Sequence, residues 1–274
     1  MKAVIILFLS YCIALQAQLK QISVPYTRYI LPNGLNVILH EDHTTPTVTV
    51  NMWYHVGSGY EKPGRTGFAH LFEHLMFMGS GHVPQGQFDK LLEAAGGDNN
   101  GSTNTDRTNY FEDVPSNALE LALYLDSDRM GFLLDAMSPK SVDAQRDVVK
   151  NERRQSYENR PYGLAWENIY KNLYPEGHPY NWTTIGSMTD LSAASYEDVV
   201  DFFKTYYTPN NASLCIAGDI NPEKTLELVK KWYGGIPAGK PAPPIDPPAA
   251  KLKNKIITAF MSIPLLLLLK IYMK

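Results

Sequence analysis

Alternating apolar and polar residues predict that the first part of the chain is rich in β-strands. Residues 26–30 and 35–40 flank Pro32-Asn33-Gly34, and an Asn-Gly pair between apolar runs predicts a β-hairpin. Over residues 47–56 every second side chain is apolar, which predicts a half-buried strand. Residues 99–112 are polar and rich in threonine, and we expect one extended strand there.

Helical spacing of apolar residues dominates the rest of the chain. Helices are expected over residues 67–78, 88–95, 118–134, 139–159, 195–206 and from Pro222 to Gly234-Gly235, with a short strand at 214–217. Ser195 with Asp198 and, separately, Asn221 are predicted to cap two of these helices. Strands and helices mix without regular βαβ alternation, so the predicted fold class is α+β, with a largely antiparallel sheet packed by helices.

The two ends of the chain differ from its middle. Lys2, an apolar run and the small residue Ala17 predict a signal peptide over residues 1–17, and therefore an exported protein, periplasmic or secreted. The main domain is expected over residues 23–236. Six prolines between Pro237 and Pro248 predict a stiff linker over residues 237–250, outside any core. The apolar tail, residues 251–274, is interpreted as the truncated or aberrant start of a missing second domain.

Composition excludes some classes of function. The chain has 25 basic and 28 acidic residues, so it lacks the basic excess of a nucleic-acid-binding protein. It shows no signature of disorder. Cys12 lies in the predicted signal, which leaves Cys215 alone in an apolar run, where we expect a buried structural thiol.

The segment with candidate chemistry is the helix predicted over residues 67–78. His70 and His74 lie one turn apart on the same side of a helix, so two imidazoles can meet one metal ion, and Glu73 projects to that side. The apolar residues form a separate stripe, Phe68, Leu71, Phe72, Leu75 and Met76. Two incidental surface histidines are the alternative, but the separation of the two stripes favours a metal site.

A zinc hydrolase needs a third protein ligand and an open position for water. Glu152 is the best candidate, because a helix would turn it toward the expected buried face of Val148 and Val149. A solvated surface charge explains Glu152 equally well from the helix pattern alone. The remaining histidines lack a convincing partner and are expected to be structural or surface residues: His40, His43, His55, His82 and His178.

His70-Leu71-Phe72-Glu73-His74 is the inverted His-x-x-Glu-His motif of the inverzincins. The chain resembles the N-terminal half of the pitrilysin/insulinase family of zinc metallopeptidases, which includes the mitochondrial processing peptidases. The resemblance covers most of residues 25–240. Its further matches are residues 57–61, 100–103, 177–180 and 206–212.

The resemblance implies roles for particular residues. Zn²⁺ would be held by His70, His74 and a later glutamate, which Glu152 matches at 78 positions after His74. Zinc lowers the pKa of its bound water to about 7. Glu73 would act as the general base, taking the water's proton and passing it to the leaving amine.

The resemblance also implies how a peptide or small protein substrate binds. In the family, the strand matched by residues 100–103 holds the substrate as an added β-strand, so Asn100, Ser102 and Thr103 are the candidate substrate-binding residues. One departure is Gln145, where family members often have an acidic residue that supports the zinc site. The family also builds its active chamber from two similar halves, which implies a C-terminal half domain or a partner subunit.

The sequence therefore predicts a zinc-dependent metalloendopeptidase. The alternative is a catalytically impaired half-enzyme or a peptide-binding scaffold that needs a C-terminal partner half, although scaffold-like relatives tend to lose the motif present here. A metal-dependent enzyme with a non-peptide substrate also stays open.

Overall fold

A computed structural model describes residues 23–249, 257–260 and 269–272 of the chain. The predicted signal peptide, residues 1–17, lies outside the described residues, as does most of the predicted tail.

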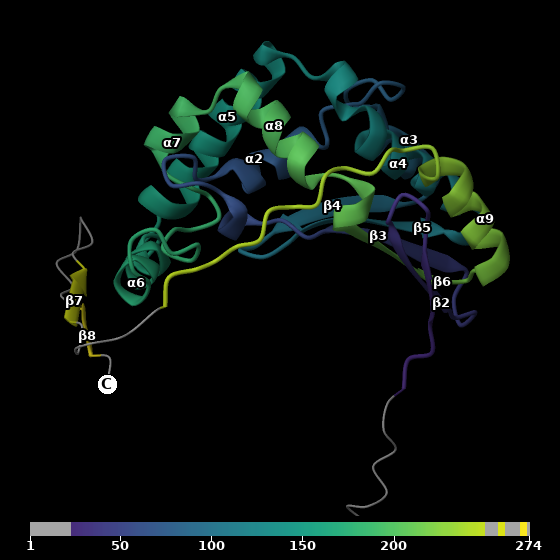
Figure 1. Cartoon of the computed structure of the whole chain (residues 1–274), viewed down its shortest axis with the longest axis horizontal. Helices are drawn as coiled ribbons and strands as arrows, with labels where there is room; N and C mark the ends of the chain where they lie inside the picture. Colours follow the sequence, from purple (N-terminus) through teal and green to yellow (C-terminus); the bar gives the residue numbers. More distant parts are fainter. Residues whose placement is uncertain (1–22, 250–256, 261–268, 273–274) are drawn as a thin grey trace, which may run out of the picture.

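A six-stranded sheet forms the base on which the helices lie (Figure 1). Its strands are β1 (Thr27–Ile30), β2 (Asn36–Glu41), β3 (Thr47–Tyr54), β4 (Asp98–Thr103), β5 (Thr108–Pro115) and β6 (Ala212–Gly218), in the spatial order β1-β2-β6-β3-β5-β4. Only the β2–β6 pair of this sheet is parallel. The predicted α+β class with a largely antiparallel sheet is therefore confirmed.

Strand β3 shows why one face of the sheet attracts the helices. Val48, Val50, Met52 and Tyr54 are at most 1% exposed, whereas Trp53 on the other face is 39% exposed. This is the alternation that the sequence predicted. The predicted hairpin is also confirmed, because β1 and β2 pair in antiparallel fashion around residues 32–34.

The prediction of one strand over residues 99–112 is wrong, since the chain forms the hairpin β4–β5 there. The Asn104 side-chain oxygen accepts hydrogen bonds from the backbone N–H groups of Asp106 and Arg107, at 2.8 and 2.9 Å. This local bond closes the turn. As a result, β4 lies at the edge of the sheet, next to α2.

Helices cover one face of the sheet (Figure 1). The helices of the described residues are α2 (Phe68–Leu75), α3 (Gln87–Ala94), α4 (Leu119–Ala136), α5 (Pro139–Arg153), α6 (Ala165–Leu173), which lies to one side of the sheet, α7 (Met188–Ala193), α8 (Tyr196–Tyr206) and α9 (Pro222–Tyr233). Short 3₁₀ turns occupy Ser58–Tyr60, Ser116–Ala118 and Pro209–Asn211. The sequence did not predict α6, which has no buried residue, or α7, which has only 6 residues.

The two helix caps that the sequence predicted are both present in the structure. Ser195 and Asp198 form a capping box on α8, and the Asn221 side chain accepts the Lys224 N–H at the start of α9. The helix predicted over residues 139–159 ends earlier than expected. Beyond Arg153 the backbone opens into a π-helical turn over Arg154–Glu158.

The proline-rich segment runs along the domain (Figure 1). The Gly239 N–H donates to the Asn210 side chain at 2.7 Å, and Ala242 packs against the core. Pro243 lines a cavity of about 340 Å³ together with Tyr60 and Arg65. The segment thus contacts the domain, although Ala242 is only partly buried and is not itself a core residue.

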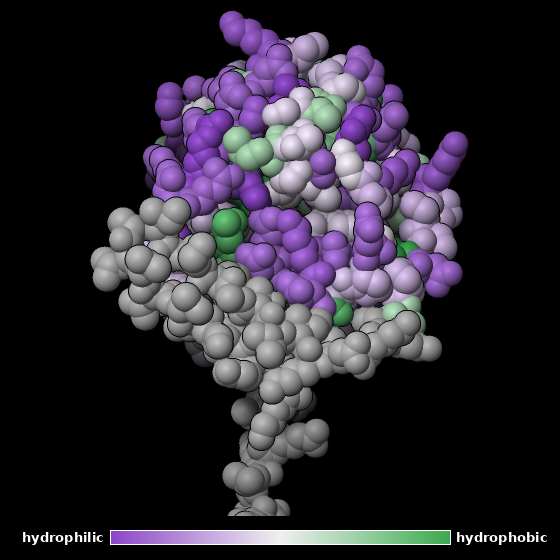
Figure 2. Space-filling view, turned by 90° about the vertical axis from the view of Figure 1, so that its left-hand side faces the viewer, coloured by the Kyte–Doolittle hydropathy of each residue, from purple (hydrophilic) through white to green (hydrophobic). Residues whose placement is uncertain are grey.

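Further along, β7 (Ile257–Phe260) pairs in antiparallel fashion with β8 (Leu269–Tyr272). Among the described residues, none of the helices combines the length and apolarity required to cross a membrane. The face turned to the viewer in Figure 2 is mostly hydrophilic, with small apolar patches.

Candidate active site

Helix α2 carries the motif and is held by its apolar stripe. Phe68, Leu71, Phe72 and Leu75 are at most 3% exposed, and the Phe72 ring stacks on Phe203 and Tyr207 of the α8 region. This burial leaves the side of the helix with His70, Glu73 and His74 partly accessible. The separation of the two stripes, which the sequence predicted, is confirmed.

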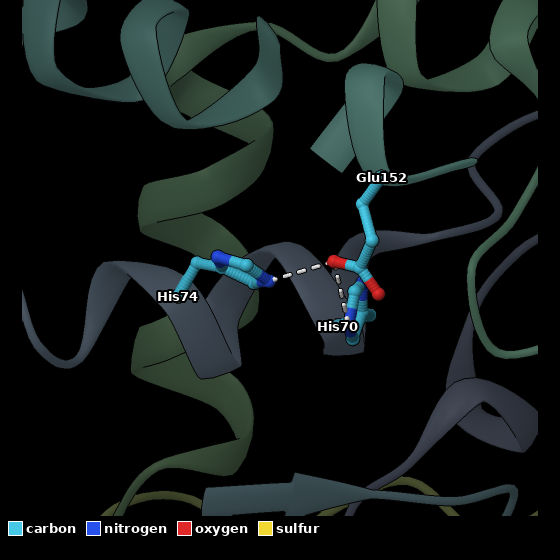
Figure 3. A group of neighbouring side chains, drawn as sticks. All are labelled: His70, His74 and Glu152. Atoms are coloured by element: carbon cyan, nitrogen blue, oxygen red, sulfur yellow. Dashed lines mark ion pairs between the residues drawn. The ribbon is translucent and has the colours of Figure 1, made fainter. Parts of the chain in front are cut away.

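Helix α5 brings Glu152 to the two histidines (Figure 3). Its carboxylate oxygen Oε2 lies 3.3 Å from Nε2 of His74 and 3.7 Å from Nε2 of His70. The sequence argument for Glu152 was only half correct, because Val149 is buried whereas Val148 is 46% exposed. Glu152 itself is half-buried, at the margin of the buried face.

These three side chains fit a metal ion. They form a group of His, Cys, Asp or Glu side chains, within the described part of the chain, whose ligand atoms all lie within 4.8 Å of one another. Two donors bound tetrahedrally to one zinc ion at about 2.0–2.1 Å lie about 3.3–3.4 Å apart. The observed separations of 3.3 and 3.7 Å are close to that value, and two imidazole nitrogens with one carboxylate are a donor set that Zn²⁺ accepts.

The charges of the group agree with ligand roles. A hydrogen bond with His74 is the largest cause of a lowered pKa of Glu152, and burial opposes it. Burial lowers the pKa of His70, although Glu152 acts in the opposite direction. A carboxylate that ionises readily and a neutral imidazole are the forms that bind a metal.

Glu73 faces strand β4. Its Oε2 accepts a hydrogen bond from the Thr103 hydroxyl at 2.5 Å. A Cβ at Gly101 would lie 3.2 Å from Cγ of Glu73, so the glycine leaves room for this carboxylate. The edge strand and the motif are thus in direct contact.

The other two candidate substrate-binding residues do not join this contact. Ser102 bonds to Asn109 on the neighbouring strand at 2.7 Å, and Asn100 is exposed, with its side-chain oxygen accepting the Gly101 N–H. Gln145, the departure from the family pattern, contacts the thioether of Met78.

Sequence reasoning missed how the start of α2 is fixed. The helix begins at Gly67, which offers no side-chain cap. The buried carboxyl group of Glu61 takes this role: Oε2 accepts the Gly67 N–H at 3.0 Å and Oε1 accepts the Ala69 N–H at 2.8 Å. The Trp182 indole N–H also donates to Oε2, at 3.1 Å. The available signal was a glycine at the N-cap position, because its lack of a capping side chain leaves the first N–H groups to another residue.

Two imidazoles and a carboxylate on neighbouring helices, with a second carboxylate beside them, are typical of the metallohydrolase class. Comparison of the sequence with known families identifies the family within this class. Residues 36–183 match the family model Insulinase (Peptidase family M16), and residues 193–260 match Peptidase M16 inactive domain. The chain therefore belongs to peptidase family M16, a family of metallopeptidases.

Individual relatives support this assignment. The chain is 35% identical to the zinc protease PqqE of Helicobacter pylori over 207 residues, which cover 75% of this chain and 46% of that protein. A crystal structure of a protease from Helicobacter pylori has a TM-score of 0.76 at 33% identity, covering 84% of this chain and 54% of that one.

A further match is the first half of the periplasmic protease PqqL from Escherichia coli, with a TM-score of 0.72 at 25% identity, covering 82% of this chain and 49% of that one. The chain thus spans about half the length of these relatives. PqqE and a second relative, YmxG of Bacillus subtilis, are both named zinc proteases, which implies Zn²⁺ as the cofactor.

Proposed function

We propose that the chain is the zinc-binding part of a metalloendopeptidase. The observation that carries this proposal is the convergence of His70, His74 and Glu152, with Glu73 beside them and in contact with the edge strand. His70, His74 and Glu152 would hold the ion. Bound zinc would supply a water whose pKa is lowered to about 7 and would polarise the scissile carbonyl.

Glu73 would move the proton. Its Oε2 is occupied by the Thr103 hydroxyl, so Oε1 is the oxygen available to accept a proton from the attacking water. The same oxygen would later return that proton to the leaving amine. The role of Thr103 is then to hold the carboxylate in one orientation.

Strand β4 is the proposed site of the peptide substrate. It lies at the edge of the sheet and contacts α2, so a peptide added along its free edge would run past the motif. Main-chain hydrogen bonds would then bind the substrate, and we assign Asn100, Ser102 and Thr103 to this strand-binding region. A peptide-binding scaffold would use the same edge, but it would have no need of Glu73.

We propose that this part of the molecule acts with a second half. Residues 23–236 would form the zinc-binding half, and residues 237–250 the connection to a C-terminal half or partner subunit. Support comes from PqqE of Helicobacter pylori and from the first half of PqqL, because this chain covers only 46% and 49% of their respective lengths. Because PqqL is a periplasmic protease, we also propose export to the periplasm or beyond the cell.

The test is a cleavage assay with a peptide library, carried out with and without zinc. It uses the chain alone and the chain mixed with the C-terminal half of a relative. We expect weak cleavage by the chain alone and a clear, zinc-dependent rise on mixing, because an open groove holds a peptide on one side only. Zinc-independent cleavage, or none under any condition despite bound zinc, would refute the proposal.

A further inference from the structure

We propose that Arg153 is a positioning residue that sets the distance between Glu152 and the two histidines. This inference rests on the zinc site proposed above. The difficulty for such a site is that its donors come from two helices, α2 and α5, and that Glu152 lies in the last turn of α5. The helix then opens into the π-helical turn Arg154–Glu158, so its hydrogen bonding does not continue regularly beyond the ligand.

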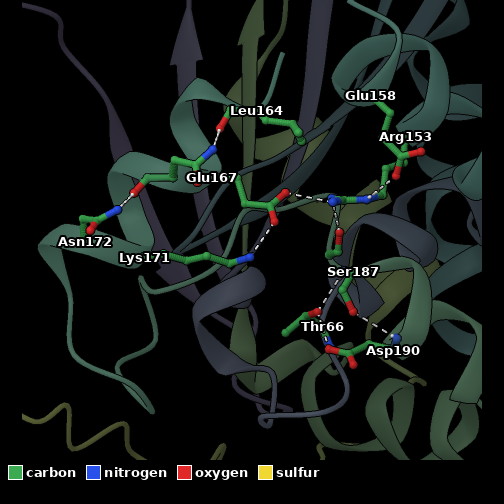
Figure 4. A network of polar contacts seen from close by, with 11 residues as sticks. Thr66, Arg153, Glu158, Leu164, Glu167, Lys171, Asn172, Ser187 and Asp190 are labelled. Atoms are coloured by element: carbon green, nitrogen blue, oxygen red, sulfur yellow. Dashed lines mark hydrogen bonds and ion pairs between the residues drawn. The ribbon is translucent and has the colours of Figure 1, made fainter. Parts of the chain in front are cut away.

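Arg153 fastens this end of α5. Its side chain is only 8% exposed, in contrast to the ligand beside it. The guanidinium Nη1 donates to the backbone oxygen of Gly186 at 2.5 Å, and Nη2 donates to Glu167 Oε2 at 2.8 Å. Nε lies 3.4 Å from Glu158 Oε1. Figure 4 shows this fork of contacts, which uses the planar shape of the guanidinium.

The Gly186 contact leads directly to helix α2. A Cβ at Gly186 would lie 2.3 Å from the backbone nitrogen of Gly67, so the two backbones are packed without space for a side chain. Gly186 also has a φ of +71°, which favours glycine. The oxygen that Arg153 binds therefore belongs to a residue that touches the first turn of the histidine helix.

Hydrogen bonds connect residues 186–190 to the segment just before α2 (Figure 4). The Ser187 N–H donates to the Thr66 hydroxyl at 3.0 Å, and the Thr66 N–H and hydroxyl donate to Asp190 at 3.1 and 2.5 Å. Thr66 stands directly before Gly67, and His70 lies one turn further along. A continuous path thus runs from Arg153 through residues 186–190 to the helix that carries both histidines.

This path explains how a half-exposed glutamate is held 3.3 and 3.7 Å from two imidazoles. If the fork were removed, Glu152 would stay on α5, but the end of α5 could shift relative to α2. The metal would then lose affinity through geometry, although all three donors remain. Loss of outer contacts around metal ligands typically lowers affinity about 10–100-fold.

The experiment compares the zinc affinity of three variants with that of the full chain, measured by competition with a chromogenic chelator. Arg153→Met removes the fork, and Arg154→Met is the matched control, because Arg154 is exposed and its side chain bonds to Asn151 on the same helix. Val149→Ala controls for stability, since it truncates a buried side chain of α5 without touching the fork. The absorption spectrum of the Co²⁺-loaded forms reports the ligand geometry independently.

We expect Arg153→Met to weaken zinc binding by about 10-fold or more and to change the Co²⁺ spectrum. Arg154→Met should match the unmodified chain in zinc affinity and in the Co²⁺ spectrum. Val149→Ala should lower the melting temperature while keeping the Co²⁺ spectrum. If Arg153→Met does not fold, Arg153→Lys retains the charge but not the fork, and it should show an intermediate loss.

Two results would overturn the inference. Zinc affinity and spectrum could be unchanged in Arg153→Met and Arg153→Lys, or they could change no more than in Val149→Ala. In both cases the unmodified chain still binds zinc and the proposed site survives. Absence of zinc binding by the unmodified chain would overturn the site and the inference together.

Discussion

Replacement of Glu61 by Gln tests how the start of helix α2 is stabilised. Burial raises the pKa of Glu61 from 4.5 to about 8, against the lowering effect of the N–H groups of Ala69, Gly67 and Trp182. The folded state therefore binds a proton on this group at pH values where the unfolded chain has lost it. Stability contributed by the protonated form is complete below about pH 4.5 and is lost as the pH rises to about 8.

The size of the effect follows from the same two values. The gap between 4.5 and about 8 corresponds to at most about 5 kcal/mol of unfolding free energy. Glutamine does not ionise, so Glu61→Gln should remove this pH dependence, although its NH₂ group cannot accept one of the N–H bonds and lowers stability by a constant amount at every pH. The free energy of unfolding of the variant, relative to that of the unmodified chain, should therefore rise steadily between pH 4.5 and about 8 and stay constant above that range.

Urea unfolding at several pH values between 4.5 and 8 measures the difference between the two proteins, so that other titrating groups cancel. Glu93→Gln, a change at an exposed position of α3, serves as the control and should give a flat difference. An unmodified chain that gains stability over Glu61→Gln as the pH rises would refute the reasoning. The ionised carboxylate, bound by three N–H groups, would then be the preferred form.

Three further predictions concern the candidate active site. Metal analysis should show that His74→Ala reduces the zinc content from one ion per chain to a small fraction. His82→Ala, which changes an exposed ring bonded to an aspartate, is the control and should keep the zinc. Stoichiometric zinc in His74→Ala would contradict the ligand set. Glu73→Gln should keep zinc and lower peptide cleavage about 10²–10⁴-fold, and a near-normal rate would require another base. Gly101→Ala places a Cβ 3.2 Å from Glu73 Cγ and should reduce cleavage more than zinc content; equal losses in both would point to general damage.

Much of the fold could be predicted because its signals are local. The alternation in β3, the Asn-Gly hairpin and the caps at Ser195 and Asn221 each depend on a few neighbouring residues. The separation of the His70–His74 side of α2 from its apolar side is of the same kind. Such patterns can be recognised within the sequence of a single helix or strand.

The features that were missed depend on contacts between distant segments. The β4–β5 turn is an exception, because Asn104 closes it with local bonds to Asp106 and Arg107, and asparagine is a typical turn residue. Glu61 accepts the N–H of the N-cap residue Gly67, six residues later, and Arg153 binds a backbone oxygen 33 residues away. Glu152 is intermediate, because its helix pattern was ambiguous and only the resemblance to a family favoured it over a surface charge. Periodicity carries no information about such partners.

The distance along the chain between the donors has a consequence for how the protein acquires its metal. His74 and Glu152 are 78 residues apart, and strands β4 and β5 with helices α3 and α4 lie between them. These intervening elements must dock before the donors meet, so a nascent or unfolded chain offers only the two histidines of a single helix. In the proposed site, the ion would meet all three donors in their final geometry only after these elements have docked. If these residues hold the zinc ion as proposed, we expect the complete set of donors to be available only in the compartment where folding is completed.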